Sequence, residues 1–310
     1  MDVLVVGGGI AGLTAARFLA LRGYGVAVAD ELCGGGRLMN IGAVSAWPDV
    51  NGSLSGPDLA GRCIESALDA GVDMLPTRIV GIEREVSWRA ESIEGDRLEA
   101  TVVILATGTI PDLALAPGST EFAGRGFSEC ASCDGPLFTG QRVAATGTSP
   151  WLASEVEHLA ELAAHVTVAS SGSGDGWEAS ADRLATLANV DVIAGRVSCL
   201  VGGVEGLESI LLESPDAAVQ RIAARALFLC DGAMACVPSQ MPGGVLYGPS
   251  GRIRTVDGVT TDLPGLFVAG DVREGSRPYL LCAAADGLSA ALSADALLRG
   301  MAAANDPATS

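Results

Sequence analysis

The chain has 310 residues, 49% of them hydrophobic, and its 37 acidic and 19 basic residues give a net charge of -18. This length and apolar content exclude general disorder and predict two domains with a large core. The negative charge argues against nucleic-acid backbones and anionic membrane surfaces as partners. The N-terminus has no signal-peptide pattern, and no stretch approaches the roughly 18 uncharged apolar residues of a membrane helix. We therefore expect a cytoplasmic protein.

The first segment has the pattern of a strand, a glycine turn and a helix. Gly7 permits the tight turn, Gly9 lets the backbone approach a pyrophosphate, and Gly12 lets the helix pack closely on the strand. The next strand, residues 26–29, ends in Asp30, whose carboxylate can accept hydrogen bonds from a ribose. This spacing predicts a complete dinucleotide site.

Further elements of the same domain follow in order. The glycine-rich run at residues 34–38 predicts an irregular loop against a flat ring, and residues 56–70 predict a helix that begins at a proline. Residues 78–89 and 97–105 alternate like antiparallel strands. Small residues close the region, as a backbone crossing near a bound cofactor requires: Ala106, Thr107 and Gly108.

Residues 111–126, rich in proline, glycine and alanine, predict a crossing into a second domain. That domain repeats the dinucleotide pattern, with strands predicted at residues 142–147 and 165–169 around a helix at residues 151–162. The repeat is incomplete, because Ser149 and Leu152 occupy the positions of its second and third glycines, where a pyrophosphate would approach.

The end of the second strand in this repeat also departs from an NADP site. Residues 170–174 hold no arginine for the 2'-phosphate of NADP. Together with the incomplete glycine turn, this predicts weak nicotinamide binding.

Two of the eight cysteines, Cys130 and Cys133, form a CxxC motif that Asp134 follows. Thiols at this spacing can form and break a disulfide reversibly, and a helix N-terminus favours the thiolate. Asp134 is the candidate proton carrier. The alternatives are a fortuitous pair and half of a zinc site, which needs two more ligands. We expect the others to be small buried hydrophobes: Cys33, Cys63, Cys199, Cys230, Cys236 and Cys282.

The last segment returns to the first pattern. Residues 263–271 predict an apolar strand that ends in Gly270 and Asp271, and residues 279–298 predict an alanine-rich helix. The Asp271 carboxylate can reach a sugar or ribityl hydroxyl.

These motifs resemble the low-molecular-weight thioredoxin reductase family over nearly the whole chain. They are Gly7 to Gly12 with Asp30, Gly35 to Leu38, Ala106 to Gly108, Arg125 to Gly126 before Cys130 to Gly135, and Ala269 to Arg273 before Ala284 to Gly287. The resemblance implies an α/β fold of two Rossmann-like, doubly wound, three-layer domains. An FAD-binding domain of residues 1–112 and 241–310 is then split by a degenerate NAD(P)-type domain, residues 113–240, that carries the CxxC.

The resemblance further implies FAD and a homodimer, and we expect no metal because a zinc site needs two more ligands than the CxxC supplies. It places Cys133 next to the flavin, lets Cys130 exchange with a substrate thiol, and makes Asp134 the acid/base. A helix that begins near Leu280 would point its first amides at the flavin's pyrimidine edge. The residues implied to bind the cofactor are Gly7, Gly9, Gly12, Asp30, Gly36, Arg37, Leu38, Ala106, Thr107, Gly108, Gly270, Asp271, Leu280 and Leu281.

Three functions remain open. The favoured one oxidises a small dithiol to a disulfide through the CxxC and FAD, with oxygen as acceptor, and resembles the flavoprotein dithiol oxidases of natural-product biosynthesis. The second is a thioredoxin reductase-type enzyme that takes electrons from NADPH or ferredoxin. The third is a flavin-binding sensor or partner protein without catalysis. Pro278 and Tyr279 replace the family's Arg-Gln pair, whereas Asp134, where many such oxidases carry histidine, fits the reductase.

Overall fold

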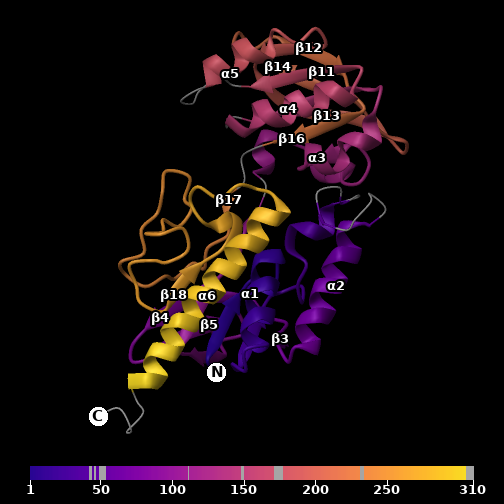
Figure 1. Cartoon of the computed structure of the whole chain (residues 1–310). Helices are drawn as coiled ribbons and strands as arrows, with labels where there is room; N and C mark the ends of the chain where they lie inside the picture. The colour runs from indigo at the N-terminus through magenta and orange to yellow at the C-terminus, as the bar shows by residue number, and fades with distance from the viewer. Residues whose placement is uncertain are drawn as a thin grey trace. The chain divides into compact units, whose positions relative to one another are not determined.

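A computed structural model describes residues 1–41, 44, 47–48, 54–110, 112–147, 150–170, 177–230 and 234–304. The chain forms two compact units, which Figure 1 shows with their elements labelled. Unit 1 consists of Met1–Met39, Gly56–Ile110 and Met234–Ser310, and unit 2 consists of Asn40–Ser55 and Pro111–Ala233. Each unit has its own parallel sheet and its own hydrophobic core.

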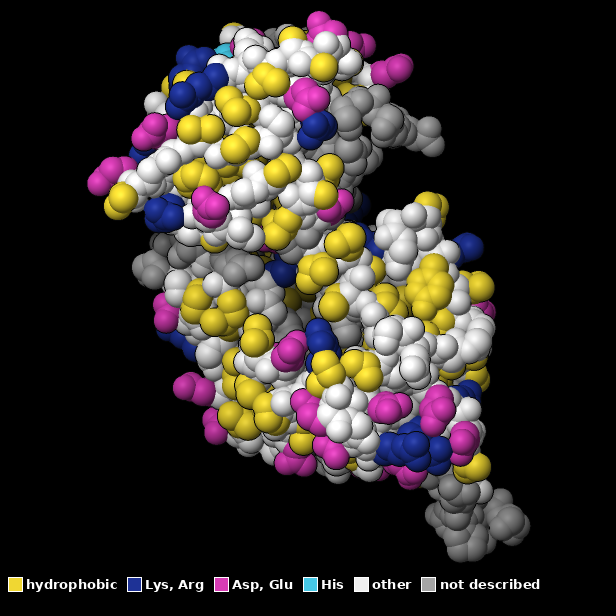
Figure 2. All heavy atoms as spheres, turned by 180° about the vertical axis from the view of Figure 1, so that it is seen from behind, with side chains coloured by type: hydrophobic (Ala, Val, Ile, Leu, Met, Phe, Trp, Pro, Cys, Tyr) yellow, Lys and Arg dark blue, Asp and Glu magenta, His cyan; other side chains and the backbone are white. Residues whose placement is uncertain are grey.

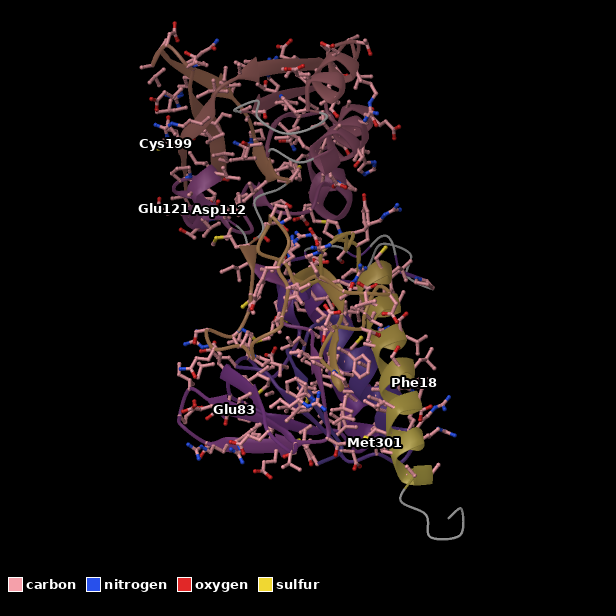
Figure 3. All side chains as sticks on the ribbon, turned by 90° about the vertical axis from the view of Figure 1, so that its left-hand side faces the viewer. Phe18, Glu83, Asp112, Glu121, Cys199 and Met301 are labelled. Atoms are coloured by element: carbon pink, nitrogen blue, oxygen red, sulfur yellow. The ribbon has the colours of Figure 1, made fainter. Side chains whose placement is uncertain are left out.

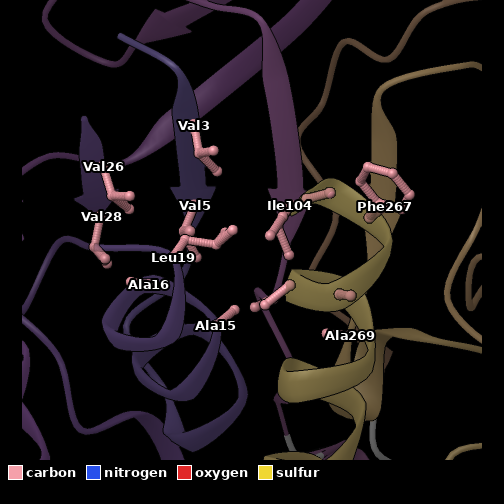
Figure 4. Packing of buried hydrophobic residues seen from close by; sticks show 14 of the residues in the cluster. Val3, Val5, Ala15, Ala16, Leu19, Val26, Val28, Ile104, Phe267 and Ala269 are labelled. Carbon is pink, nitrogen blue, oxygen red and sulfur yellow. The ribbon is translucent and has the colours of Figure 1, made fainter. Parts of the chain in front are cut away.

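The main sheet of unit 1 has five parallel strands in the order β18-β7-β1-β2-β3. Their bounds are β1 Val3–Val6, β2 Val26–Ala29, β3 Asp73–Leu75, β7 Val102–Leu105 and β18 Leu266–Val268. β1 and β7 are apolar at every position, which suits strands that are buried on both faces. One face packs on α1 (Ile10–Ala20), α2 (Gly56–Asp69) and α6 (Leu280–Ala304), and Figure 4 shows α1 and α6 beside the strands.

The opposite face of this sheet carries a small antiparallel sheet in the order β4-β5-β6. Its strands are β4 Ile79–Arg84, β5 Trp88–Ser92 and β6 Arg97–Ala100. The single strand predicted over residues 97–105 is therefore wrong, because the chain bends at Thr101 and the apolar run after it enters the main sheet as β7. The prediction of antiparallel strands is confirmed for β4, β5 and β6, although residues 78–89 cover β4 and only the start of β5. A short antiparallel pair, β8 (Thr109–Ile110) and β17 (Met234–Ala235), completes unit 1.

Unit 2 repeats the three-layer plan. Its parallel sheet has the order β12-β11-β10-β16-β9. The strands are β9 Phe127–Ser128, β10 Arg142–Thr146, β11 His165–Ser170, β12 Val190–Ala194 and β16 Ala226–Leu229. The helices α4 (Pro150–Leu162) and α5 (Trp177–Leu184) pack on one face. The antiparallel strands β13 (Arg196–Gly203), β14 (Gly206–Glu213) and β15 (Val219–Ala223) form a further sheet, which packs on the other face. The fold is α/β with two Rossmann-like domains, as the sequence predicted.

Helix α6 is longer and more apolar than the sequence analysis expected. It extends to Ala304 rather than residue 298, and by length and composition it could cross a membrane. Its residues Gly287, Ala290, Ala291 and Ala294 are buried in the core of unit 1, however. A core helix of a soluble protein passes the same test, so this is weak evidence for a membrane span. Figure 2, which shows the molecule from behind relative to Figure 1, has acidic and basic side chains side by side over its lower part.

A buried carboxylate joins the end of α1 to α6. Asp295, 6% exposed, accepts hydrogen bonds from Arg22 Nη1 at 2.7 Å, the Tyr24 hydroxyl at 2.8 Å and Arg299 Nε at 2.9 Å. The hydrogen bond from Arg299 contributes most to holding the pKa of Asp295 below its ordinary value, and Tyr24 and Arg22 lower this pKa further. Phe18, labelled in Figure 3, packs against the same core.

Asp295→Asn is expected to lower the melting temperature at neutral pH, because the amide is uncharged and leaves Arg22 and Arg299 without a paired carboxylate. The folded-state pKa of Asp295 lies below its unfolded value, so its stabilisation is present above the unfolded pKa and is lost as pH falls through the folded pKa. The difference in melting temperature between the two proteins should therefore shrink below about pH 4. Thermal melts between pH 3 and pH 8 test this, and a constant difference would contradict it.

Candidate functional site

The glycine turn after β1 has the packing that a dinucleotide site requires. A Cβ on Gly12 would stand 1.9 Å from the carbonyl oxygen of Gly7, and one on Gly7 would stand 2.4 Å from the carbonyl oxygen of Ala106. Both positions therefore need glycine. Over Gly9, which caps the N-terminus of α1 without a side-chain hydrogen bond, nothing lies within 4 Å of a Cβ. The open space is thus at the helix N-terminus, where a pyrophosphate can approach.

Asp30, predicted to contact a ribose, accepts hydrogen bonds from three backbone amides of its own chain. Its Oδ2 accepts the Gly8 amide at 2.7 Å, while Oδ1 accepts the amides of Leu32 at 3.0 Å and Gly34 at 2.9 Å. The carboxylate therefore fixes the glycine turn and the loop after β2 to one another. A carboxylate has about four acceptor positions, so one remains for a ribose hydroxyl.

The loop after β2 is partly regular, contrary to the sequence prediction. Gly34 and Gly35 have positive φ of 107° and 101°, and the chain then forms the 3-10 helix η1, Gly36–Asn40. Leu38 is 2% exposed and anchors this turn in the protein. Arg37 extends from η1 and donates from Nη1 to Asp271 Oδ2 at 3.3 Å and Thr109 Oγ1 at 3.5 Å.

The turn after β18 is fixed by an ion pair. Arg273 binds Asp286 through Nε at 3.1 Å and Nη2 at 2.9 Å, and the Gly270 amide donates to the same carboxylate at 3.2 Å. The strand is shorter than predicted, because the chain turns at Gly270, with φ of 75°, into the 3-10 helix η5 (Gly270–Val272). Asp271 stands in this turn and also accepts the Ser276 hydroxyl at 3.3 Å.

The N-terminus of α6 follows the turn after β18, with residues 273–279 between η5 and the helix. The helix begins at Leu280 as expected, and the Leu281 side chain is 46% exposed. Gly287 sets how closely α6 approaches α1, because a Cβ there would stand 2.1 Å from the carbonyl oxygen of Ala11. The sequence analysis named Gly287 in a motif but gave it no role.

The residues of unit 1 fit FAD. The space over Gly9 suits a pyrophosphate, and the buried Thr107 Oγ1 has no hydrogen-bond partner among the described residues. Such an unpaired buried hydroxyl is uncommon and suits a ligand that supplies the missing partner. The predicted cofactor residues all belong to unit 1.

The predicted redox residues belong to unit 2. Cys130 is disulfide-bonded and caps α3 (Ala131–Asp134), a single turn whose dipole is small. The Asp134 carboxylate accepts the Ser128 hydroxyl at 2.7 Å. The Cys133 side chain lies outside the described residues, so the predicted pairing of Cys130 with Cys133 stays a prediction. Within the described part of the chain, no group of three or more histidine, cysteine or acidic residues could hold a metal.

The other six cysteines are free thiols, but the prediction that all are buried is wrong. Cys33 and Cys199 are exposed and the remaining four are half-buried. Burial raises the pKa of the Cys63 and Cys236 thiols, which makes them poor nucleophiles at neutral pH.

The glycine repeat of unit 2 differs from its prediction at Leu152. This side chain is fully buried and packs in the core of unit 2 with Val143 and Val156, so it does not stand in the path of a pyrophosphate. Ser149 and residues 171–174 lie outside the described residues. Ser170 is buried, and its hydroxyl donates to the carbonyl oxygen of Gly147 at 3.0 Å.

Sequence reasoning missed the residues that position others. Ser128 carries no motif signal beyond its place two residues before Cys130. Arg273 and Asp286 stood in recognised motifs, and their opposite charges were the signal that could have predicted the pair.

Comparisons with known proteins agree with this geometry. The chain is 34% identical to a component of the alkyl hydroperoxide reductase of Pseudomonas aeruginosa over 96% of its own length and 58% of that protein, so it spans little more than half of that relative. It is 28% identical to the thioredoxin reductase of Borreliella burgdorferi, over 94% of this chain and 90% of that one. The solved thioredoxin reductase of Streptococcus pyogenes has the same fold, with a TM-score of 0.82, 26% identity and coverage of 96% of this chain and 98% of that one.

A family model described as pyridine nucleotide-disulphide oxidoreductase matches residues 1–287, most of the chain. The match runs through the glycine turn and the CxxC, and it ends at Gly287 of α6. The chain therefore belongs to the pyridine nucleotide-disulphide oxidoreductase family, whose members are in general flavin-dependent, and it has a thioredoxin reductase-like fold.

Proposed function

We propose that this chain is a thioredoxin reductase-type flavoprotein, which reduces the disulfide of a thioredoxin-like protein with electrons from a reduced nicotinamide. The observation that carries this is the presence of two sites in one chain, a dinucleotide turn at residues 7–12 and a disulfide-bonded Cys130 with Asp134 four residues after it. The likeness to thioredoxin reductases over nearly the full length supports it.

In this proposal residues 1–112 and 241–310 bind FAD, which when bound passes an electron pair between a nicotinamide and a disulfide. Gly9 and the α1 N-terminus receive the pyrophosphate. Asp30 and Asp271 accept hydroxyl hydrogen bonds, while Arg37 and Ser276 hold the Asp271 carboxylate in place.

Residues 113–240 supply the thiol chemistry. Cys130 and Cys133 form the disulfide, which takes up two electrons and two protons to become a dithiol. The Cys130 thiolate then attacks the disulfide of the partner, and Cys133 resolves the mixed disulfide. Asp134 supplies and recovers the protons that the thiols exchange.

The electron donor in this proposal is NADH rather than NADPH. The sequence after β11 has no arginine before Arg183, and it carries Asp175, Glu178 and Asp182. Arg183 itself is paired with Glu157 at 2.7 Å. This stretch of the sequence therefore offers a 2'-phosphate no free arginine for a charge-assisted hydrogen bond, and its charged residues other than Arg183 are acidic.

An anaerobic titration of the yellow protein tests the function directly. We expect NADH to bleach the flavin, NADPH to need concentrations at least about tenfold higher, and the reduced enzyme to reduce a thioredoxin-like protein. Bleaching by a small dithiol but by neither nicotinamide would contradict the proposal.

A dithiol oxidase that uses oxygen as acceptor is the second candidate, and the arginine-free sequence after β11 is the observation that favours it. It predicts oxygen uptake and peroxide formation with a panel of small dithiols. The buried position of Leu152 weakens this alternative, because this side chain would not block the approach of a pyrophosphate.

A homodimer and a cytoplasmic location complete the proposal, both by likeness to the thioredoxin reductases. Light scattering that gives a single species of 31.2 kDa would contradict the dimer.

A further inference from the structure

Ser128 links the parallel sheet of unit 2 to the short helix α3, which Cys130 caps and Asp134 ends. It lies in β9, where it pairs with Phe228 of β16, and it is 6% exposed. Its hydroxyl donates to Asp134 Oδ2 at 2.7 Å and accepts the Cys130 amide at 3.1 Å. The carbonyl oxygen of Cys130 is a second acceptor for the same hydroxyl, at 3.3 Å.

The hydroxyl can satisfy both protonation states of Asp134. A serine hydroxyl has one hydrogen to donate and two lone pairs that accept. When Asp134 is a carboxylate, the hydrogen points to Oδ2, the shorter and charge-assisted bond. When Asp134 is protonated, its own hydrogen can point to Ser128 Oγ, and the serine hydrogen turns to the Cys130 carbonyl oxygen. The same heavy-atom positions are therefore compatible with both states.

We propose that Ser128 is a positioning residue that holds Asp134 in one place while its proton leaves and returns. This inference rests on the proposed function. In the exchange step, the Cys130 thiolate bonds to one sulfur of the partner disulfide and the partner's S–S bond breaks. The departing thiolate takes the proton from Asp134, and the Ser128 hydrogen turns from the Cys130 carbonyl to the new carboxylate. A lone pair of the Cys130 sulfur forms the new S–S bond, and the electron pair of the broken bond leaves with the departing sulfur. The exchange therefore needs no further oxidant.

The test is the pH dependence of disulfide reduction in the full-length holoenzyme. Dithiothreitol reduces the protein at pH 4 to 9, rapid alkylation stops the reaction, and the mass of the peptide that carries Cys130 reports the reduced fraction. The six free cysteines do not contribute to that peptide. Each rate is divided by the thiolate fraction of dithiothreitol, so that the remaining pH dependence reports the protonation of Asp134.

In the wild type the corrected rate should fall as the pH rises, because Asp134 loses the proton that it gives to the departing thiolate. In Asp134→Asn this fall should disappear. Ser128→Ala should move the midpoint of the fall to higher pH, because the carboxylate loses the hydrogen bond that the Ser128 hydroxyl donates to its charged form. Ser128→Thr keeps the hydroxyl and should restore the wild-type midpoint. A purely structural role would instead lower the rate by the same factor at every pH.

Ser119→Ala is the matched control. Ser119 is a buried serine of the same unit, 1% exposed, and its Oγ makes no hydrogen bond with the part of the chain that the structure describes. Its profile should equal that of the wild type. A Ser128→Ala profile that matches the wild type, or a Ser119→Ala midpoint that moves equally, would overturn the inference.

The inference stays falsifiable if Ser128→Ala does not fold, because a folded Ser128→Thr variant that lacks the wild-type midpoint would overturn it. The assay uses neither a nicotinamide nor a thioredoxin-like protein. Failure of the flavin titration would therefore refute the proposed donor without changing this profile. A fall that persists in Asp134→Asn would refute the role of Asp134 itself and with it the inference.

Discussion

Cys130→Ser is expected to lower the rate at which the enzyme reduces a protein disulfide by about a thousandfold or more, because the attacking sulfur is lost. FAD content should not change, since the predicted cofactor residues belong to unit 1 and Cys130 to unit 2. The measurement is the steady-state reduction of a thioredoxin-like protein, together with the flavin absorbance of the purified variant.

The matched control is Cys199→Ser, which removes an exposed free thiol from the same unit (Figure 3). It should retain full activity. A similar loss in both variants would mean that the assay reports general damage rather than the redox pair.

Cys133→Ser should separate the roles of the two cysteines. We expect this variant to hold the partner as a stable mixed disulfide through Cys130, because no second thiol resolves it. Mass spectrometry of the trapped peptide identifies the attacking cysteine. If Cys130→Ser traps the partner and Cys133→Ser does not, the two roles are reversed.

The sequence was sufficient to predict the parts of the fold that local rules control. The first strand, glycine turn and helix follow from the spacing of Gly7, Gly9 and Gly12, and the structure has the same elements there. The strand predicted over residues 97–105 was wrong because one alternating pattern was assigned to two different segments. β6 is polar at every second position, whereas β7 is apolar at all four and is buried on both faces, and this change of pattern marks where the chain changes sheets.

The site was less predictable because its contacts join distant parts of the chain. Arg37 and Asp271 are 234 residues apart, and no period or spacing relates them. Leu152 was judged by its place in a glycine motif, whereas its packing in the core decides what it obstructs. Ser128 is local to the CxxC, but its role depends on a side-chain direction that a sequence does not contain.

Gly287→Ala is expected to separate α6 from α1 and thereby to disrupt FAD binding. The new Cβ would stand 2.1 Å from the carbonyl oxygen of Ala11, an atom of the helix whose N-terminus is proposed to receive the pyrophosphate. Backbone atoms cannot move aside as a flexible side chain can, so the helices must move apart. Overpacking of this kind costs about 1–3 kcal/mol, which corresponds to several degrees in melting temperature for a chain of this size.

Gly300→Ala in the same helix is the matched control, because it makes the same chemical change where nothing lies within 4 Å of the new Cβ. Alanine has the higher helix propensity, so this variant should gain about 0.5–1 kcal/mol and bind FAD normally. Titration of the two apoproteins with FAD, followed by fluorescence quenching, should show at least tenfold weaker binding for Gly287→Ala alone. Equal affinities would mean that the approach of α6 to α1 does not control the cofactor site, and that the glycine serves only the packing of the core.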